Sequence, residues 1–312
     1  MAIDKNFYNE ASAAKMDWDP SWFGEIEFDE ELIKAVKKFQ RAHRLTADGL
    51  VGPTTYRRIW TDREANISDV SEPVVRTTKV SSSNHIVHNG NLYPIDWDAV
   101  VLWDEPDGLA TAKGQYYSYA GKEDRKPTLF VNHWDVCLTS KSCANVLAKR
   151  GISIHFCIDN DGTIYQLLDT QHAAWHASGR SWNHASIGVE ISNAYYPKYQ
   201  KNYVKMGFGE RHLVEGATCH GHKLDPFLGF YPAQIKALKA LWLAVHRAVG
   251  IPLTCPLDSD GELVTGVSTE CAKNKFEGFV NHYNLTRRKI DCAGLDLVGL
   301  LDDVKEAKAQ DD

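Results

Sequence analysis

The sequence lacks the features that mark membrane, exported and nucleic-acid-binding proteins. No apolar run in its 312 residues is long enough to span a bilayer, so we expect no membrane insertion. The stretch from Met1 to Asn6 contains no apolar signal core, which predicts synthesis in a cytoplasm without a signal peptide. The net charge of −6 gives no support for binding to nucleic acid. These absences leave a globular protein of ordinary composition, with 43% hydrophobic and 24% charged residues.

The chain contains seven cysteines, an odd number. The seven cysteines form no CxxC pair, which argues against a full disulfide framework and against a cysteine-rich structural zinc site. We expect most of the thiols to be reduced and partly buried. A cysteine peptidase is a further hypothesis, but the sequence contains no recognisable Cys-His motif to support it.

Residues 28–60 predict a small helical unit. Asp29 is a candidate helix N-cap between the hydrophobic staple residues Phe28 and Ile33. The segment 47–53 predicts a turn, and a second helix is expected from Thr54 to Trp60. Seven basic residues and one acidic residue lie between Leu32 and Trp60, which predicts either a solvated helix face or attraction to an anionic polymer.

A polar segment follows the helical unit. Residues 63–93 include Ser81-Ser82-Ser83 and show no sustained apolar period, which predicts a linker. The length of the chain suggests two domains. We therefore expect a helical module over residues 1–62, a linker over 63–93 and a larger domain over 94–312.

The larger domain contains several short apolar runs that predict buried strands. The first, Thr128 to Val131, leads into His133, and a histidine at the open end of a buried strand can face a cleft while the strand holds its backbone. Another strand places the acidic Glu190 among apolar neighbours. The expected strands and the turn between two of them cover residues 128–131, 152–158, 159–162 (turn), 163–168 and 186–193.

Two amphipathic helices are expected after these strands. Pro232 opens one that Gly250 and Pro252 end, and another starts near Asp296. Strands followed by such helices predict an α/β fold with a mixed central sheet flanked by helices, beside the small all-α N-terminal domain. The long segment 194–231 has no assigned role, and its Cys219-His220-Gly221-His222 run fits no strong zinc signature.

The order of the motifs resembles that of a known family. His133 ends a strand, His155-Phe156 lies in the next, and Ala174-Trp175-His176-Ala177 and Ser186-Ile187-Gly188-Val189-Glu190 follow. From about Trp97 onwards the chain resembles the zinc-dependent N-acetylmuramoyl-L-alanine amidases, the family that includes the peptidoglycan-recognition proteins. The motifs Phe39-Gln40, Asp48-Gly49 and Val51-Gly52-Pro53-Thr54 resemble those of a peptidoglycan-binding module.

The resemblance implies one catalytic Zn²⁺ held by His133, His282 and a third ligand. The third ligand is Asp291, or alternatively Cys292, because the family usually has proline directly after the ligand and this chain has Cys292. Glu190 is implied as the general base and Lys289 as the group that stabilises the oxyanion. Some members use a tyrosine at the position of Ile154, which leaves the proton transfers here to Glu190.

The resemblance also implies the substrate and its contacts. Trp134, Trp175 and His176 are candidate substrate-binding residues, although the aromatic side chains could equally be core residues. The implied activity is hydrolysis of the amide bond between N-acetylmuramic acid and L-alanine in bacterial peptidoglycan. The chain resembles a bacteriophage endolysin, made in the host cytoplasm and acting on the wall after membrane permeabilisation, and we expect a monomer. The alternatives are a cytoplasmic muropeptide-recycling amidase and a non-catalytic peptidoglycan-recognition protein.

Overall fold

The N-terminal part of the chain is helical. The protein structure is a computed structural model that describes residues 3–67 and 84–311. Its first elements are α1 (Lys5–Met16), the short 3-10 helix η1 (Pro20–Phe23), α2 (Glu30–Ala42) and α3 (Pro53–Ile67). Asp29 caps α2 as predicted, because its Oδ1 accepts hydrogen bonds from the amides of Glu31 and Leu32, each at 3.0 Å.

A glycine turn joins α2 to α3. Gly49 has a φ of 82°, and a Cβ at this position would lie 2.8 Å from Ile33 Cγ2, so only glycine fits without a shift. The buried Gln40 side chain holds the turn, accepting from the Gly49 amide at 2.9 Å and donating to the Leu50 carbonyl at 3.0 Å. The Asp48-Gly49 motif is therefore a fixed structural point of the helical part.

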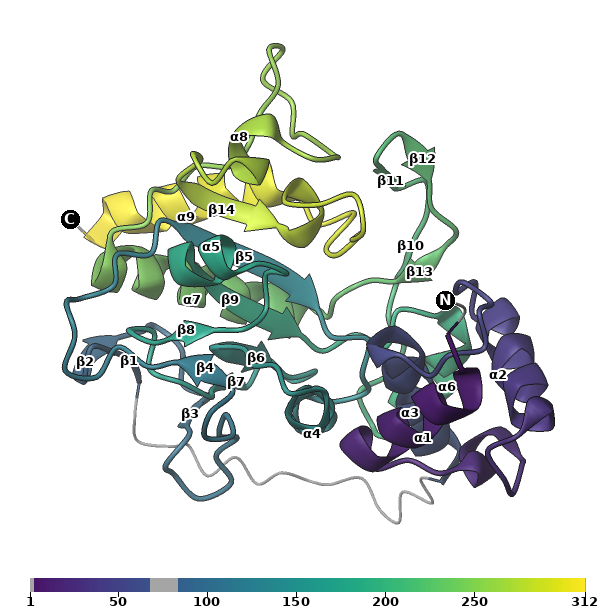
Figure 1. Ribbon diagram of the computed structural model, residues 1–312. Coiled ribbons are helices and arrows are strands. Elements are labelled where there is room, and N and C mark those ends of the chain that lie inside the picture. Colours follow the sequence, from purple (N-terminus) through teal and green to yellow (C-terminus); the bar gives the residue numbers. More distant parts are fainter. Residues whose placement is uncertain (1–2, 68–83, 312) are drawn as a thin grey trace.

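A six-stranded mixed sheet forms the centre of the larger part (Figure 1). Its strand order is β14-β5-β9-β6-β7-β3. The first four strands in this order run parallel, β7 runs antiparallel to β6, and β3 is parallel to β7. The strands are β3 (Val100–Leu102), β5 (Leu129–Trp134), β6 (Phe156–Ile158), β7 (Ile164–Gln166), β9 (Ser186–Ile191) and β14 (Gly278–Asn281).

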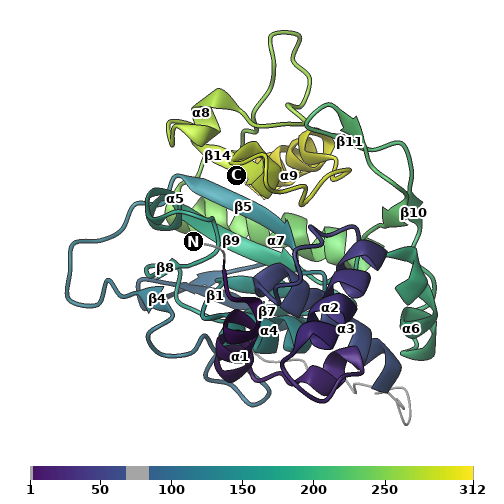
Figure 2. The ribbon, with the colours of Figure 1, turned by 45° about the vertical axis from the view of Figure 1, so that its right-hand side comes forward.

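Helices cover both faces of this sheet (Figures 1 and 2). One face packs on α7 (Pro232–Val249) and α9 (Leu297–Asp311), where the Trp242 ring contacts Phe279 in the main core. The other face meets α4 (Ser140–Arg150), α5 (Arg180–Ala185) and the helical N-terminal part. Because both faces are covered, all six residues of β5 are buried.

Smaller elements complete the described residues. The hairpin β1–β2 and the pair β4–β8 lie beside the sheet, and the segment 194–231 contains short helices and strands rather than one irregular loop. These elements are β1 (His85–His88), β2 (Asn91–Pro94), β4 (Tyr116–Tyr117), β8 (Ala173–Ala174), η2 (Pro197–Tyr199), α6 (Gln200–Lys205), β10 (Leu213–Val214), β11 (Thr218–Cys219), β12 (His222–Lys223), β13 (Phe227–Leu228), α8 (Thr269–Ala272) and η3 (His282–Asn284).

The predicted fold class is confirmed, with a central mixed sheet, flanking helices and a helical N-terminal region. The segment 63–93 is expected to be a linker, but the structure has regular elements at both of its ends. It begins with the end of α3 and closes with the β1–β2 hairpin, in which Ile86 and Val87 are buried in the main core. These strands are too short to show a sustained period in the sequence. Ser81-Ser82-Ser83 lies outside the described residues.

The N-terminal helices and the larger part share one hydrophobic core. Met16, Val36 and Tyr56 of the helical part belong to the same buried cluster as Cys137 and Leu147 of the larger part. Hydrogen bonds join the two parts in the same region, from Trp60 Nε1 to Ser142 Oγ at 3.0 Å and from Thr61 Oγ1 to the Val136 carbonyl at 2.8 Å. The helical part is therefore docked on the larger part (Figure 2).

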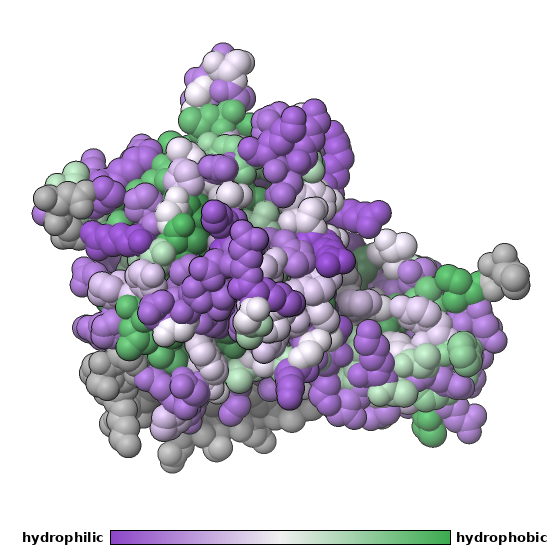
Figure 3. All heavy atoms as spheres, turned by 60° about the vertical axis from the view of Figure 1, so that its left-hand side comes forward, coloured by the Kyte–Doolittle hydropathy of each residue, from purple (hydrophilic) through white to green (hydrophobic). Residues whose placement is uncertain are grey.

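The surface is predominantly polar on the face shown in Figure 3, where hydrophobic residues are scattered among hydrophilic ones. None of the helices described is long and apolar enough to cross a membrane. All seven cysteines are free, and Cys255 alone among them is not fully buried.

Two acidic residues at the docking surface allow a test of its stability. Asp62 accepts hydrogen bonds from Lys198 Nζ and Tyr199 OH, both at 2.6 Å, and lies 3.0 Å from His43 Nε2. Asp17 pairs with Lys149 in solvent, with its side chain 78% exposed. We expect Asp62→Asn to lower the free energy of unfolding by about 1–3 kcal/mol and Asp17→Asn by about 0–1 kcal/mol, measured by urea unfolding.

The effect of Asp62 should depend on pH. Burial alone would raise the pKa of Asp62, but hydrogen bonds from His43, Lys198 and Tyr199 lower it well below its usual value. A lowered pKa in the folded state stabilises the protein above the unfolded pKa of about 3.9 and loses this contribution as the pH falls. The difference between wild type and Asp62→Asn should therefore be constant near neutral pH and shrink below about pH 4. A difference that grows in acid would contradict this assignment.

Candidate active site

Parallel strand pairing brings the predicted site residues to one edge of the sheet. His133 on β5 lies opposite Glu190 on β9. Asn132 on β5 lies opposite Asn281 on β14, so His282, the first residue of η3, follows at the same end. Side chains of parallel partners point to the same face of a sheet, which explains why these residues meet.

Three potential metal ligands form a tight triangle. His133 Nδ1 lies 2.9 Å from His282 Nδ1 and 3.1 Å from Asp291 Oδ2, and His282 Nδ1 lies 3.0 Å from the same oxygen. The three side chains belong to residues that are 2%, 1% and 8% exposed. Among the described residues, this is the group of histidine, cysteine and acidic side chains whose ligand atoms converge closely enough to hold a metal ion.

The chemistry of this triangle fits a bound cation. A ring nitrogen carries either one proton or one lone pair in the ring plane, so no proton assignment turns all three contacts into hydrogen bonds. If both histidines donate to Asp291, their two N–H groups face each other. A divalent ion removes this conflict, because both nitrogens and the carboxylate then present lone pairs to it. The donor set of two imidazoles and a carboxylate suits zinc.

Electrostatics hold the ligands in metal-binding protonation states. Burial, and then the neighbouring His282, lowers the pKa of His133 to about 4. Burial also lowers the pKa of His282. For Asp291, burial acts in the opposite sense, but the two neighbouring histidines, His282 first, hold its pKa well below the usual value. Near neutral pH the site therefore has neutral imidazoles and an ionised carboxylate, as metal ligands require.

Both histidines have partners for their outer nitrogens. His133 Nε2 donates to His176 Nδ1 at 2.9 Å, and His176 Nε2 donates to Ser186 Oγ at 3.1 Å. The Ser186 hydroxyl donates in turn to the Trp182 carbonyl at 2.6 Å. His282 Nε2 lies 3.4 Å from Ser178 Oγ. The chain through His176 and Ser186 fixes the tautomer that leaves Nδ1 of His133 facing the triangle.

Gly188 makes room for this arrangement. A Cβ on Gly188 would lie 2.5 Å from His176 Cε1, so the glycine of the Ser-Ile-Gly-Val-Glu motif lets the His176 ring lie over β9. His155 lies nearby and accepts a hydrogen bond from the Gly188 amide at 3.1 Å. Its Nε2 donates to the His172 carbonyl at 3.0 Å, so His155 links the backbone of β9 to the segment before β8.

Glu190 and Lys289 lie within electrostatic reach of each other beside the triangle. Burial, and then the charge of Asp135, raises the pKa of Glu190 to about 8. Its Oε2 is buried and has no hydrogen-bond partner within the described part of the chain. Burial lowers the pKa of Lys289, although the charge of Asp291 opposes that shift. The site thus contains a carboxylate that can exchange protons near neutral pH and a nearby ammonium group.

The other candidate residues lie elsewhere. Cys292, the alternative third ligand, is fully buried in the main core, whereas Asp291 joins the two histidines. Trp134 alternates with His133 along β5, so it packs on the opposite face against Tyr195 and is 4% exposed. Trp175 is half-buried and packs edge-on against Tyr117.

Sequence reasoning missed several neighbours of the site. Asp135 accepts hydrogen bonds from the amides of Cys137 and Asn193, both at 2.9 Å, and so ties the end of β5 to the end of β9. His220, in the segment without an assigned role, donates from Nε2 to the Lys289 carbonyl at 2.8 Å. Asp135 follows the strand motif directly and could have been found there. The contact of His220 joins residues 69 positions apart, and no local pattern indicates it.

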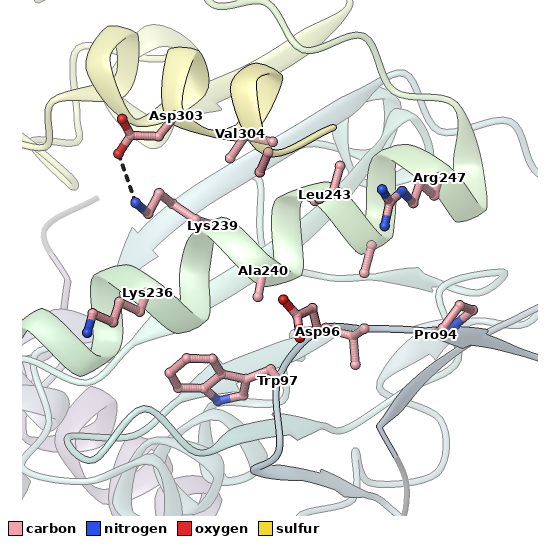
Figure 4. Close-up of a pocket in the computed structure, with 13 residues that line it drawn as sticks. Pro94, Asp96, Trp97, Lys236, Lys239, Ala240, Leu243, Arg247, Asp303 and Val304 are labelled. Atoms are coloured by element: carbon pink, nitrogen blue, oxygen red, sulfur yellow. Dashed lines mark hydrogen bonds and ion pairs between the residues drawn. The ribbon is translucent and has the colours of Figure 1, made fainter. Parts of the chain in front are cut away.

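A separate cavity of about 260 Å³ lies between residues 94–97, α7 and α9 (Figure 4). Lys239 and Asp303 form an ion pair of 2.8 Å at its edge. None of the predicted site residues lines this cavity.

Two family models match parts of the chain. Residues 123–256 match the family N-acetylmuramoyl-L-alanine amidase, and residues 26–59 match a peptidoglycan binding domain. The second match covers α2 and the Asp48-Gly49 turn. A comparison with curated proteins gave no match.

Several solved structures are similar to this chain at low sequence identity. The N-acetylmuramoyl-L-alanine amidase LysC from Clostridium intestinale is 16% identical, with a TM-score of 0.36, over 67% of this chain and 97% of that chain. Hydrolase AmiA from Staphylococcus aureus is 12% identical, with a TM-score of 0.39, over 68% of this chain and 84% of that chain. The amidase AmiD from E. coli, solved with its substrate, is 21% identical, with a TM-score of 0.29, over 45% and 55%.

Proposed function

We propose that this chain, which carries an N-acetylmuramoyl-L-alanine amidase domain and a peptidoglycan-binding domain, holds one zinc ion with His133, His282 and Asp291. The chain is a peptidoglycan hydrolase that acts on the amide bond between N-acetylmuramic acid and L-alanine. The observation that supports the metal site is the buried triangle of ligand atoms, which no arrangement of protons satisfies.

The residues around the triangle have distinct tasks in this hydrolysis. Zinc on such a donor set supplies a Lewis acid that polarises a carbonyl and lowers the pKa of water to about 7. Glu190 accepts a proton from the attacking water and passes it to the leaving nitrogen as the C–N bond breaks. Its raised pKa suits both transfers. Lys289 donates a hydrogen bond to the carbonyl oxygen as negative charge develops there. The products are a lactyl carboxylate and a stem peptide with a free L-alanine amine.

His176 is proposed to orient the metal ligand His133 and also to line the substrate cleft. It accepts from the outer nitrogen of His133 and is itself held by Ser186. Trp175, with an indole N–H that has no partner within the described residues, is the better placed of the two predicted tryptophans to contact substrate. Trp134, on the opposite face of β5, is assigned a packing role.

The biological setting is proposed to be lysis of a host cell from within, as for an endolysin. The combination of an amidase domain with a wall-binding domain supports this setting. It favours intact wall as the substrate over the small fragments that a recycling amidase processes. A binding-only recognition protein would have no need of the ligand triangle or of Glu190. We further propose that the chain is a monomer that is made in the host cytoplasm and reaches the wall after membrane permeabilisation.

The hydrolysis can be tested on purified peptidoglycan. We expect mass spectrometry to detect released stem peptides that begin with L-alanine, and we expect a zinc chelator to abolish their release. Glu190→Gln should retain zinc but lose about 10²–10⁴ in kcat, because the general base is missing. The exposed Glu262→Gln is the matched control and should keep full activity. New reducing sugar ends, or undiminished activity of Glu190→Gln, would contradict the mechanism.

The role of His176 can be tested through metal affinity. His176→Phe keeps a ring over Gly188 but removes the acceptor for His133 Nε2, so the Kd for zinc should rise about 10–100-fold. Competition with a chromophoric chelator measures this change without any need for activity. The exposed His222→Phe should bind zinc like wild type. Equal affinities for all three proteins would remove His176 from the support of the metal site.

A further inference from the structure

Helix α3 continues beyond the peptidoglycan-binding match and meets the catalytic part. The match ends at residue 59, whereas α3 runs to Ile67. The last turns of the helix, residues 60–67, make contacts with the start of α4. The Trp60 indole N–H donates to Ser142 Oγ at 3.0 Å, and the Ser142 hydroxyl donates in turn to Glu64 Oε2 at 2.6 Å. These turns therefore belong, by their contacts, to the catalytic part as much as to the wall-binding part.

Thr61 of the same turns contacts the segment that directly follows β5. Its side chain is fully buried, and its hydroxyl donates to the Val136 carbonyl at 2.8 Å. The hydroxyl oxygen also lies 3.1 Å from the Arg57 carbonyl, but that carbonyl already accepts the Thr61 amide within the helix. A hydroxyl has a single proton, so the shorter contact, to Val136, is the one that it serves.

Val136 has a backbone conformation that a β-branched residue rarely adopts. Its φ is 55°, in the left-handed region, and the residue is buried. Such a conformation persists only where the surrounding structure holds it. The Thr61 hydroxyl provides one such hold from the N-terminal part of the chain, and it acts on the carbonyl of the strained residue itself.

The turn at Val136 joins the ends of the two strands that carry the site. The Asp135 carboxylate accepts a hydrogen bond from the Asn193 amide at 2.9 Å, and Asn193 follows the end of β9. His133 lies two residues before Asp135, and Glu190 lies opposite His133 in the pairing of β5 with β9. A shift of this turn would therefore change the position of His133 relative to Glu190.

We infer that residues 60–67 are a functional part of the active site, and that Thr61 is a positioning residue whose hydroxyl holds the turn after β5 and thereby the spacing of His133 and Glu190. The inference rests on the proposed function, in which these two residues act as a metal ligand and the general base. Thr61 acts through Val136 and Asp135. The N-terminal part thus has a second task besides attachment to the wall, because it completes the support of the catalytic residues.

A soluble muramyl peptide, whose hydrolysis needs no attachment to the wall, tests this role in the full chain. Thr61→Val keeps the shape of the side chain but lacks the donor, whereas Thr61→Ser keeps the hydroxyl. We expect Thr61→Val to lower kcat about 10-fold and to leave KM within about 2-fold of wild type, because small displacements of catalytic groups are costly. Thr61→Ser should recover most of this loss. Thr54→Val, at an exposed threonine of the same helix, is the matched control and should behave like wild type.

The affinity for zinc provides a measurement that does not depend on activity. Competition with a chromophoric chelator should show a Kd for Thr61→Val that is raised about 3–10-fold, because His133 is held less firmly, and a Kd for Thr61→Ser close to that of wild type. All rates are measured well below the thermal midpoint of each variant, so that a loss of stability alone leaves kcat unchanged.

The outcomes distinguish this inference from the proposed function. Wild-type values of kcat and zinc affinity for Thr61→Val would overturn the inference, even with a lowered thermal midpoint. An equal loss in Thr61→Ser would also overturn it, because the hydroxyl would then not be the cause. If Thr61→Val does not fold, Thr61→Ala, which lacks the same donor, takes its place. A wild-type chain that leaves the peptide intact would overturn the proposed function, and the zinc affinities would then decide on the inference.

Discussion

Three neighbouring strands, β14, β5 and β9, run parallel and end at one edge of the sheet, and the site depends on this pairing. The register places Glu190 on one side of His133 and brings His282 to its other side. The Asp291 segment is then held by the hydrogen bond from the Tyr283 amide to the Asp291 carbonyl at 3.0 Å. A slip of one residue in β5 would exchange His133 for Trp134 on the cleft face, and the ligand triangle would be lost.

Local patterns in the sequence predict the parts of the site that lie on strands. Residues 128–193 contain a strand that ends in histidine and an apolar strand that contains an acidic residue. The two ligands farther along the chain are predicted only by the family resemblance. The choice between Asp291 and Cys292 needed the structure, because adjacent residues point in different directions and only their surroundings show which one faces the histidines. The same alternation separates Trp134 from His133.

Other parts of the site could not be predicted from the sequence, because they depend on how distant segments pack. The contact between α3 and the segment after β5 depends on the shared core, which no local period indicates. His220 reaches Lys289 from the segment 194–231 for the same reason. The short β1–β2 hairpin shows the limit of periodicity, since two buried residues are too few to define a pattern.

The shared core also affects how this chain can be engineered. In many modular proteins a binding domain can be exchanged as an independent cassette, because few contacts cross its boundary. Here Cys137, Cys143 and Leu147 are buried in the same cluster as Met16, Val36 and Tyr56. Removal of residues 1–67 would leave an apolar face with two free thiols open to solvent. A chimera that keeps α3 in place and replaces only the outer surface of α2 retains that cover.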